Sequence, residues 1–245
     1  MESINGKVAI VTGGNRGFGR GIAEALAANG AKVFTVSRRP SESPSSSITE
    51  VIGDATDEAL RDSLFAQQTP DLLILNAGIK PQMMAPQEQS WEAFSAVWNN
   101  DLKHSVLWSQ KAMLAPMKPG STVLVVSSGA AMQGSPLSGG YAGAKRMQWF
   151  FSNYLQQESD KLGLGLRFCT LIPKALSPET EIGRNTAASY AMARGVSIDV
   201  VFGGFGPPLT TAIIGQGALD ILSRAAPEGR TYTITGKGLE VFEKS

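Results

Sequence analysis

The chain has 245 residues, enough for one α/β domain or two small ones with a sizeable core. Its 22 Lys and Arg residues nearly balance its 21 Asp and Glu residues, and a net charge of +1 argues against nucleic acid or an anionic membrane surface as a partner. With one cysteine (Cys169) and one histidine (His104), internal disulfides, histidine metal sites and Ser-His-Asp triads are excluded. The sequence shows no signal peptide and no segment of transmembrane length, so we expect a cytoplasmic protein without a metal.

Short apolar runs alternate with helical patterns along the chain. In chain order we expect strand 7–13, helix 20–30, strand 31–37, strand 48–54, helix 58–68, strand 71–78, helix 90–114, strand 121–129, helix 141–163, strand 165–173, helix 209–223 and strand 231–236. Such alternation predicts a doubly wound parallel sheet with helices on both faces. With no second core, linker or repeat in the pattern, we expect one domain over residues 1–245.

Two stretches depart from this alternation. Residues 38–47 are rich in Pro and Ser, which predicts an irregular loop where a doubly wound fold normally has a crossover helix. Residues 175–206 are rich in Gly and Ala and show no strand pattern. We expect a substrate lid there, although its small residues also suit a helix packed closely against its neighbours.

The sequence VTGGNRGFGRG follows the first expected strand and opens a helix. This is the context that a dinucleotide-binding loop requires, because glycines permit the tight turn and the helix N-terminus offers free N–H groups to a pyrophosphate. The loop residues expected to contact a cofactor are Gly13, Asn15, Arg16, Gly17, Phe18 and Gly19.

The end of the second expected strand carries arginines where an NAD site would have a carboxylate. Arg38 and Arg39 can pair with a 2'-phosphate through charge-assisted hydrogen bonds, and Arg16 can reach the same point. For Arg39 alone a solvated surface arginine explains the sequence equally well. The combination of Arg38 with Arg16 favours NADP(H).

With TGGNRGFG, NAG (76–78), SSG (127–129) and YAGAK (141–145) in this order, the chain resembles the short-chain dehydrogenase/reductase family. The resemblance implies an NAD(P)-dependent oxidoreductase on a Rossmann-like single domain, often a dimer or tetramer packed through its two long helices. It also implies that Tyr141 is the catalytic acid/base, that Lys145 activates it and that Ser128 orients the substrate carbonyl. The further cofactor contacts that it implies are Asp54, Ala55, Asn76, Ala77, Gly78, Tyr141, Lys145 and Pro173.

The chemistry of Tyr141 and Lys145 follows from their spacing. Residues at i and i+4 share a helix face, and an ammonium beside a phenol favours the phenolate. An isolated phenol titrates near 10, and a reduction by about 3 units takes roughly 4 kcal/mol. Ser128 ends a strand and can donate to a carbonyl oxygen while Tyr141 delivers the proton. We therefore expect Tyr141 to act as acid in reduction and as base in oxidation.

Two positions depart from the family pattern. The family usually has an asparagine that completes a proton relay in the long central helix, and alignment by apolar positions puts Asp101 there. Asn100 could serve only if a bulge shifts the helix register, and a plain surface role stays open for both residues. Lys174 replaces a glycine after Pro173, either as a solvated lysine or as a contact for an anionic substrate or the cofactor phosphates.

The leading prediction is an NADPH-dependent enzyme that interconverts a carbonyl and a secondary alcohol. The alternative is a non-catalytic NADP(H)-binding sensor or scaffold protein of the same fold. The expected partners are a small carbonyl or alcohol substrate and further copies of the chain, in a homodimer or homotetramer. The aromatic residues that suggest an oligomer interface, with core burial as the other explanation, are Trp98, Trp108, Trp149, Phe150 and Phe151.

Overall fold

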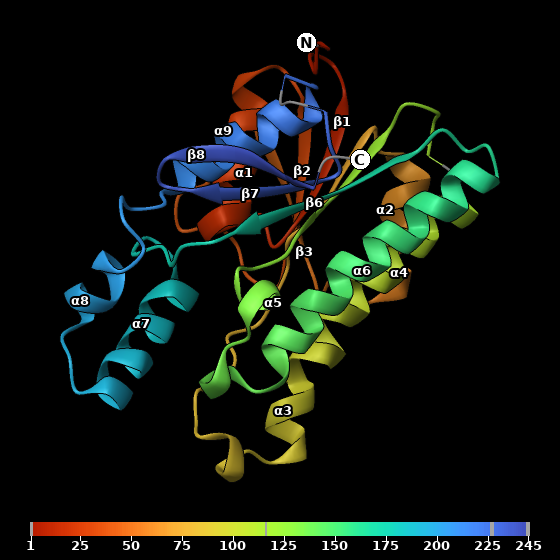
Figure 1. Ribbon diagram of the computed structural model, residues 1–245. Coiled ribbons are helices and arrows are strands. Elements are labelled where there is room, and N and C mark those ends of the chain that lie inside the picture. The colour runs from red at the N-terminus through yellow and green to blue at the C-terminus, as the bar shows by residue number, and fades with distance from the viewer. Residues whose placement is uncertain (1, 116, 226–227, 244–245) are drawn as a thin grey trace.

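The computed structural model describes residues 2–115, 117–225 and 228–243. In these residues one eight-stranded sheet has the order β3-β2-β1-β4-β5-β6-β7-β8, with β1 to β7 parallel and β8 antiparallel to β7 (Figure 1). The strands are β1 (Val8–Thr12), β2 (Lys32–Ser37), β3 (Ile48–Ile52), β4 (Leu72–Leu75), β5 (Thr122–Val126), β6 (Arg167–Pro173), β7 (Thr231–Thr235) and β8 (Gly238–Glu243). The predicted doubly wound, Rossmann-like sheet is confirmed.

Helices cover both faces of the sheet. The helices α1 and α9 pack on one face, and α2, α4 and α6 pack on the other (Figure 1). The helices are α1 (Gly17–Ala28), α2 (Glu58–Gln67), α3 (Trp91–Val97), α4 (Lys103–Leu114), α5 (Ala130–Gln133), α6 (Gly140–Lys161), α7 (Glu181–Arg194), α8 (Ile198–Gly203) and α9 (Thr211–Leu222).

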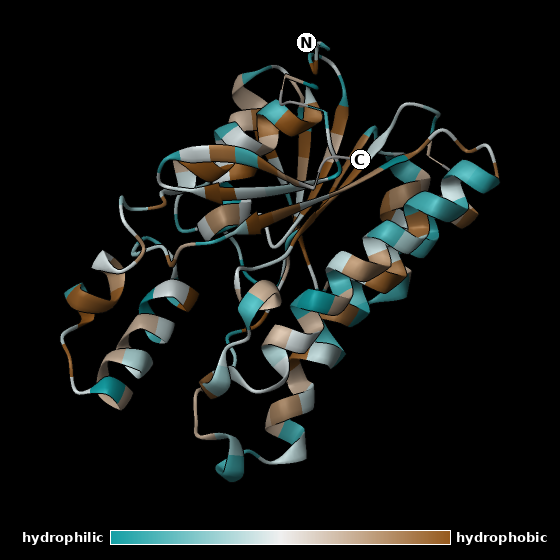
Figure 2. Cartoon of the chain, viewed as in Figure 1, coloured by the Kyte–Doolittle hydropathy of each residue, from teal (hydrophilic) through white to brown (hydrophobic). Residues whose placement is uncertain are grey.

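The central strands are apolar throughout because both faces of the sheet are covered. All four residues of β4 and all five of β5 are buried, and Figure 2 shows these strands as hydrophobic. Successive side chains alternate between the faces: Ile74 packs in the cluster beneath α1 and α9, and Leu73 and Leu75 pack in the cluster beneath α2 and α4.

The predicted lack of a crossover helix between β2 and β3 is confirmed. Residues 38–47 form bends and turns, and polar side chains hold this loop against the sheet edge. Asn15 donates from Nδ2 to the Arg39 carbonyl (2.8 Å) and to Glu50 (3.1 Å), whose carboxylate also accepts from the Ser41 backbone (3.0 Å). Arg20 on α1 donates to the Ser43 carbonyl at 2.7 Å.

The structure departs from the expected elements in several places. The helix expected over residues 90–114 is interrupted by a π-helical turn, η2 (Trp98–Leu102), between α3 and α4. The short helix α5 and strand β8 were not predicted, and no strand was expected beyond the Gly236 turn. The alternation after that turn is nevertheless present: Leu239 and Val241 pack on the core, and Glu240 lies between them on the other face.

The region expected to form a lid contains two helices, α7 and α8, that stand away from the sheet (Figure 1). Small residues let them pack together, with Ala187, Ala191 and Val201 buried in a cluster of their own. Of the aromatic residues expected either at an oligomer interface or in the core, Trp108 and Trp149 are buried, so core burial is the explanation that holds for these two.

Candidate active site

A single hydroxyl group joins the glycine loop to the turn after β4. Thr12 ends β1, and its Oγ1 accepts hydrogen bonds from the backbone N–H groups of Asn76 (3.0 Å) and Ala77 (3.1 Å). The Asn76 side chain donates to the Gly13 carbonyl at 3.2 Å. Because β1 and β4 are parallel neighbours, both loops lie at the carboxyl edge of the sheet, where α/β proteins bind ligands.

The glycine loop is open toward the start of α1. Gly13 has a φ of +67°, and a Cβ atom at Gly13 or Gly19 would collide with the neighbouring backbone or the Asn76 amide. Arg16 at the N-cap makes no side-chain capping bond, whereas α2, α3, α7, α8 and α9 all have one. The N–H groups at Gly17 and Phe18 therefore belong to a helix start that suits an anion.

The predicted arginines follow the end of β2, at the same carboxyl edge of the sheet. Arg38 and Arg39 are exposed, and within the described residues neither side chain donates a hydrogen bond. Nearby, Thr56 donates to the Asp54 carboxylate from its backbone and its hydroxyl (2.8 Å each). The backbone bond is the main cause that lowers the pKa of Asp54, and the Arg38 charge adds to it. Ala55 is buried, and its carbonyl accepts from the indole of Trp108.

Two predicted loop residues make contacts that the sequence did not suggest. The amide of Asn15 is turned into the protein, where it holds the loop 38–47. Arg16 forms an ion pair with Glu181 in the first turn of α7 at 2.6 Å, and Lys80 approaches the same carboxylate at 3.7 Å. The glycine loop is thus tied to the expected lid.

The predicted catalytic residues Ser128, Tyr141 and Lys145 lie on two segments, the end of β5 and the start of α6. The hydroxyl of Ser127 donates to the Lys145 carbonyl at 2.8 Å and so anchors α6 to β5. Ser128 follows directly, and its Oγ accepts weakly from the Ala130 N–H at 3.3 Å. Tyr141 lies in the first turn of α6, and the Nζ atom of Lys145, one turn later, lies 5.6 Å from the centre of its ring.

The end of β6 lies against the residue after Ser128. The Gly129 N–H donates to the Pro173 carbonyl at 2.7 Å, and a Cβ atom at Gly129 would lie 3.1 Å from the Cα atom of Lys174. The Lys174 side chain is exposed and makes no hydrogen bond within the described residues. Pro173 therefore lies at the predicted edge, and both roles considered for Lys174 stay open.

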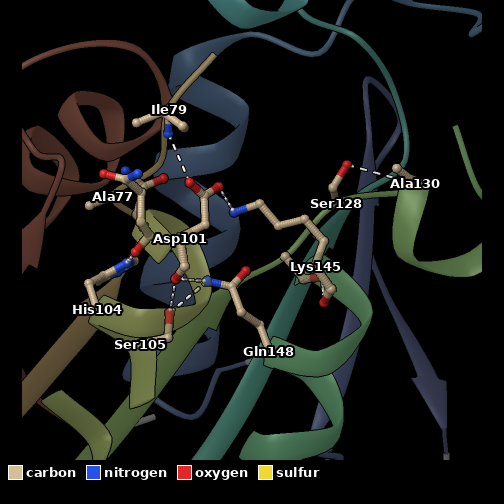
Figure 3. A network of polar contacts seen from close by, with 12 residues as sticks. Ala77, Ile79, Asp101, His104, Ser105, Ser128, Ala130, Lys145 and Gln148 are labelled. Carbon is tan, nitrogen blue, oxygen red and sulfur yellow. Dashed lines mark hydrogen bonds and ion pairs between the residues drawn. The ribbon is translucent and has the colours of Figure 1, made fainter. Parts of the chain in front are cut away.

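The π-helical turn decides which residue of the central helix faces Lys145. Asn100 is turned back along its own helix and donates to the Ala96 carbonyl at 2.8 Å. Asp101 points the other way (Figure 3): its Oδ2 lies 3.1 Å from Lys145 Nζ and its Oδ1 accepts from the Ile79 N–H at 2.9 Å. The side chains of Asp101 and Lys145 are 1% and 5% exposed, so the contact is a buried ion pair.

His104 is buried beside this ion pair, and no sequence pattern connects it with the site. Its Nδ1 lies 3.3 Å from the Asn100 carbonyl and its Nε2 lies 3.3 Å from the Thr12 hydroxyl. A carbonyl only accepts, so the proton lies on Nδ1, and Nε2 faces the Thr12 hydroxyl, whose proton the Ile74 carbonyl can also accept (3.3 Å). Burial lowers the pKa of His104 to about 4, which leaves the imidazole neutral. Gln148 on α6 also joins this network, through the Asp101 carbonyl (2.7 Å).

A surface pocket of about 390 Å³ opens beside the site, between the segments 86–94 and 133–142. Neither Ser128 nor Tyr141 lines it. Ser135, at its edge, shares a hydrogen bond of 2.8 Å with Tyr190 of α7, so this loop is a second point at which the expected lid is held.

A model of the short chain dehydrogenase family matches residues 7–189, from the start of the first strand to α7. The chain belongs to the short-chain dehydrogenase family. It is therefore an oxidoreductase of a family that uses a nicotinamide cofactor and acts on small molecules.

Several relatives of this short-chain dehydrogenase are reductases. It is 30% identical over 178 residues to the 3-oxoacyl-(acyl-carrier-protein) reductase FabG of Escherichia coli (strain K12), over 66% of this chain and 71% of that protein. It is 29% identical over 161 residues to the hydroxynaphthalene reductase-like protein Arp2 of Metarhizium robertsii, over 59% of each chain.

Solved structures show the same fold at lower identity. Levodione reductase is similar with a TM-score of 0.79 and 20% identity, over 95% of this chain and 97% of that one. The 3-ketoacyl-(acyl-carrier-protein) reductase from Brucella melitensis, complexed with NADH, gives a TM-score of 0.76 at 22% identity, over 96% of this chain and 98% of that one.

Proposed function

We propose that this short-chain dehydrogenase is an NADP(H)-dependent oxidoreductase that interconverts a carbonyl and a secondary alcohol. The observation that carries the proposal is the buried ammonium of Lys145, 5.6 Å from the Tyr141 ring and one helical turn from it, beside the strand end that presents Ser128. The relatives support the reaction type, since one is named a reductase and the other a reductase-like protein.

The residues at the sheet edge fit a phosphorylated dinucleotide. The uncapped start of α1 suits the pyrophosphate, and the exposed Arg38 and Arg39 suit a 2'-phosphate. Asp54 and Ala55 line the adenine end in this proposal, and the turn 76–78 lines the middle of the cofactor. When bound, the cofactor supplies the hydride acceptor or donor.

The protein's part in the reaction is binding, orientation and proton transfer. The Ser128 hydroxyl donates to the substrate oxygen and so holds it beside Tyr141. The Tyr141 phenol gives its proton to that oxygen in reduction and takes it back in oxidation, and the Lys145 ammonium stabilises the phenolate. Asp101 acts in this set through Lys145.

The substrate we propose is a ketone or secondary alcohol of moderate size. The 3-oxoacyl-(acyl-carrier-protein) reductase FabG, whose name describes a substrate with a 3-oxo group, supports a ketone as the group that is reduced. Within the described residues no helix is both long and apolar enough to cross a membrane. We propose a cytoplasmic enzyme.

We also propose that the enzyme is a homodimer or homotetramer. Exposed aromatic side chains gather on α3, η2 and α6, and packing against a second copy would cover them. They are Trp91, Phe94, Trp98, Phe150 and Tyr154. Sedimentation equilibrium of the wild type tests this statement, and a monomer at micromolar concentration contradicts it.

The test of the reaction is Tyr141→Phe, assayed by NADPH oxidation over a panel of ketones. We expect kcat/KM to fall by roughly 10³-fold or more, because proton transfer and its coupling to Lys145 are both lost. Tyr154→Phe is the matched control, since Tyr154 lies on the same helix with its side chain exposed. Full activity of Tyr141→Phe rejects the assignment. Tight NADPH binding with no turnover of any ketone by the wild type favours the alternative, a sensor or scaffold protein.

A further inference from the structure

Two basic side chains, His104 and Lys145, are buried near one another, and only Lys145 forms an ion pair with a carboxylate within the described residues. His104 is 1% exposed, and burial lowers the pKa of its imidazole to about 4. Burial is also the largest influence on Lys145 and acts to lower its pKa, but Asp101, with help from Tyr141, outweighs it and the pKa is raised. Burial thus favours the neutral form of both bases, and the direct contact with Asp101 offsets it for Lys145 only.

The groups around the Asp101 side chain suit a carboxylate. The Ile79 N–H donates to Oδ1 (2.9 Å), and the Lys145 ammonium lies 3.1 Å from Oδ2 in an ion pair, as Figure 3 shows. Neither neighbour offers an acceptor while Lys145 is charged. An asparagine in this position has one acceptor oxygen and turns its NH₂ group toward one of the two donors.

Three elements hold the carboxylate in this place. The π-helical turn η2 directs Asp101 inward, and Gln148 on α6 fixes its carbonyl at 2.7 Å. After β4, Gly78 leaves room for it: a Cβ atom there would lie 2.6 Å from Asp101 Oδ2. The other titratable groups that face the pair are His104, on α4, and Tyr141, on α6.

We infer that Asp101 is the buried counter-ion of Lys145 and that it fixes both the charge and the position of the ammonium beside Tyr141. The catalytic importance of this role rests on the proposed function, whereas the ion pair itself can be tested without turnover. Asp101 is a positioning residue, because it acts on the reaction through Lys145.

The first experiment measures urea unfolding of the cofactor-free protein at pH 6.5 and pH 9.5, for the wild type and Asp101→Asn. Without its counter-ion, Lys145 titrates lower in the folded state than in the unfolded chain, so low pH favours unfolding of the variant. The difference between the urea midpoints of wild type and variant is expected to be larger at pH 6.5 than at pH 9.5. An equal gap at both pH values overturns the inference.

A variant that lacks the Lys145 charge supplies the control for the unfolding experiment. In Lys145→Met, the change Asp101→Asn is expected to raise the unfolding midpoint, because it removes a buried carboxylate that has lost its partner. The effect of Asp101→Asn thus reverses sign between the two backgrounds. A lower midpoint for the double variant than for Lys145→Met overturns the inference, and this comparison holds even where Asp101→Asn alone fails to fold.

The second experiment connects the ion pair to the reaction. The ratio of kcat/KM for Asp101→Asn to that for the wild type is expected to fall at least tenfold between pH 6.5 and pH 9, as Lys145 loses its charge. If Asp101 had a purely structural role, the ratio of the two kcat/KM values would be lowered equally at every pH. That result overturns the catalytic part of the inference. If the wild type turns over no carbonyl substrate, the proposed function fails while the unfolding experiments still decide the role of Asp101.

Discussion

The two ends of the proposed cofactor site are built by opposite means. At the catalytic end, Asp101, His104 and Lys145 are buried, and Asp101 on η2 forms an ion pair with Lys145 on α6. At the adenosine end, Arg38 and Arg39 are exposed on a loop that replaces a helix. A buried charge pair tolerates little change because both partners have lost their water, whereas an exposed cation can be exchanged at small cost. Substitutions at the catalytic end should therefore lower both stability and activity, whereas substitutions at the adenosine end should alter only the choice of cofactor.

The largest effect is expected from Gly78→Ala. The added methyl group would lie 2.6 Å from Asp101 Oδ2, so the carboxylate must leave Lys145 and Ile79. Breaking a buried pair costs about 3–5 kcal/mol, and we expect a comparable loss of unfolding free energy in urea and at least 100-fold lower kcat/KM. Gly203→Ala is the control, because nothing lies within 4 Å of its added methyl. If Gly78→Ala were as active as this control, the catalytic end would tolerate an added methyl group despite its burial, and the expected contrast between the two ends would be wrong.

The next largest effect is the loss of folding stability at low pH that buried His104 causes at the catalytic end. Because the pKa of His104 is about 4 in the folded protein and near 6.5 when unfolded, the unfolded chain binds the extra proton first. Stability is therefore lost as pH falls from about 6.5 to 4, by about 3 kcal/mol for this group. His104→Gln lacks this loss.

Urea unfolding from pH 7 to pH 4 checks the role of His104. The gap in unfolding free energy between wild type and His104→Gln should narrow by that amount as the pH falls. If the two curves stay parallel, the acid sensitivity comes from carboxylates elsewhere, and the catalytic end does not differ from the rest of the fold in this respect.

The sequence predicted the parts of the site that depend on local chemistry. The glycine loop, the turn 76–78 and the spacing of Tyr141 and Lys145 are each contained in a few adjacent residues, and all of them lie within the residues that the family model matches. The missing helix between β2 and β3 was also predictable, since Pro and Ser in residues 38–47 oppose helix formation.

What the sequence could not give were the contacts made across elements. The π-helical turn has no composition of its own, so the choice between Asn100 and Asp101 depended on packing against α6. His104 entered the site only because α4 lies beside the end of β1. The ion pair between Arg16 and Glu181 joins residues far apart in the chain, which no local pattern shows.

At the adenosine end, Arg38→Asp should change cofactor preference without disturbing the fold. Loss of a charge-assisted pair and gain of a repulsive charge should raise KM for NADPH roughly 50-fold and KM for NADH less than about 3-fold. Lys118→Asp, which makes the same charge change at another exposed position, is the control. Equal losses for both cofactors would contradict the 2'-phosphate role and with it the division of labour between the two ends.

The smallest effect is expected from Glu50→Gln, which tests whether the exposed end has support of its own. The Glu50 carboxylate accepts from the Ser41 backbone and from Asn15, and lies 3.7 Å from Arg20, so it holds the loop that carries the arginines. A glutamine keeps one acceptor oxygen and loses the charge, a change worth about 1 kcal/mol. NADPH titrations should therefore show about 3- to 5-fold weaker binding, with NADH less affected. Unchanged NADPH binding would mean that Arg38 and Arg39 need no positioned loop, and the exposed end would then differ even more from the buried end. A loss of NADPH binding as large as that of Arg38→Asp would mean that the two ends tolerate substitution equally poorly.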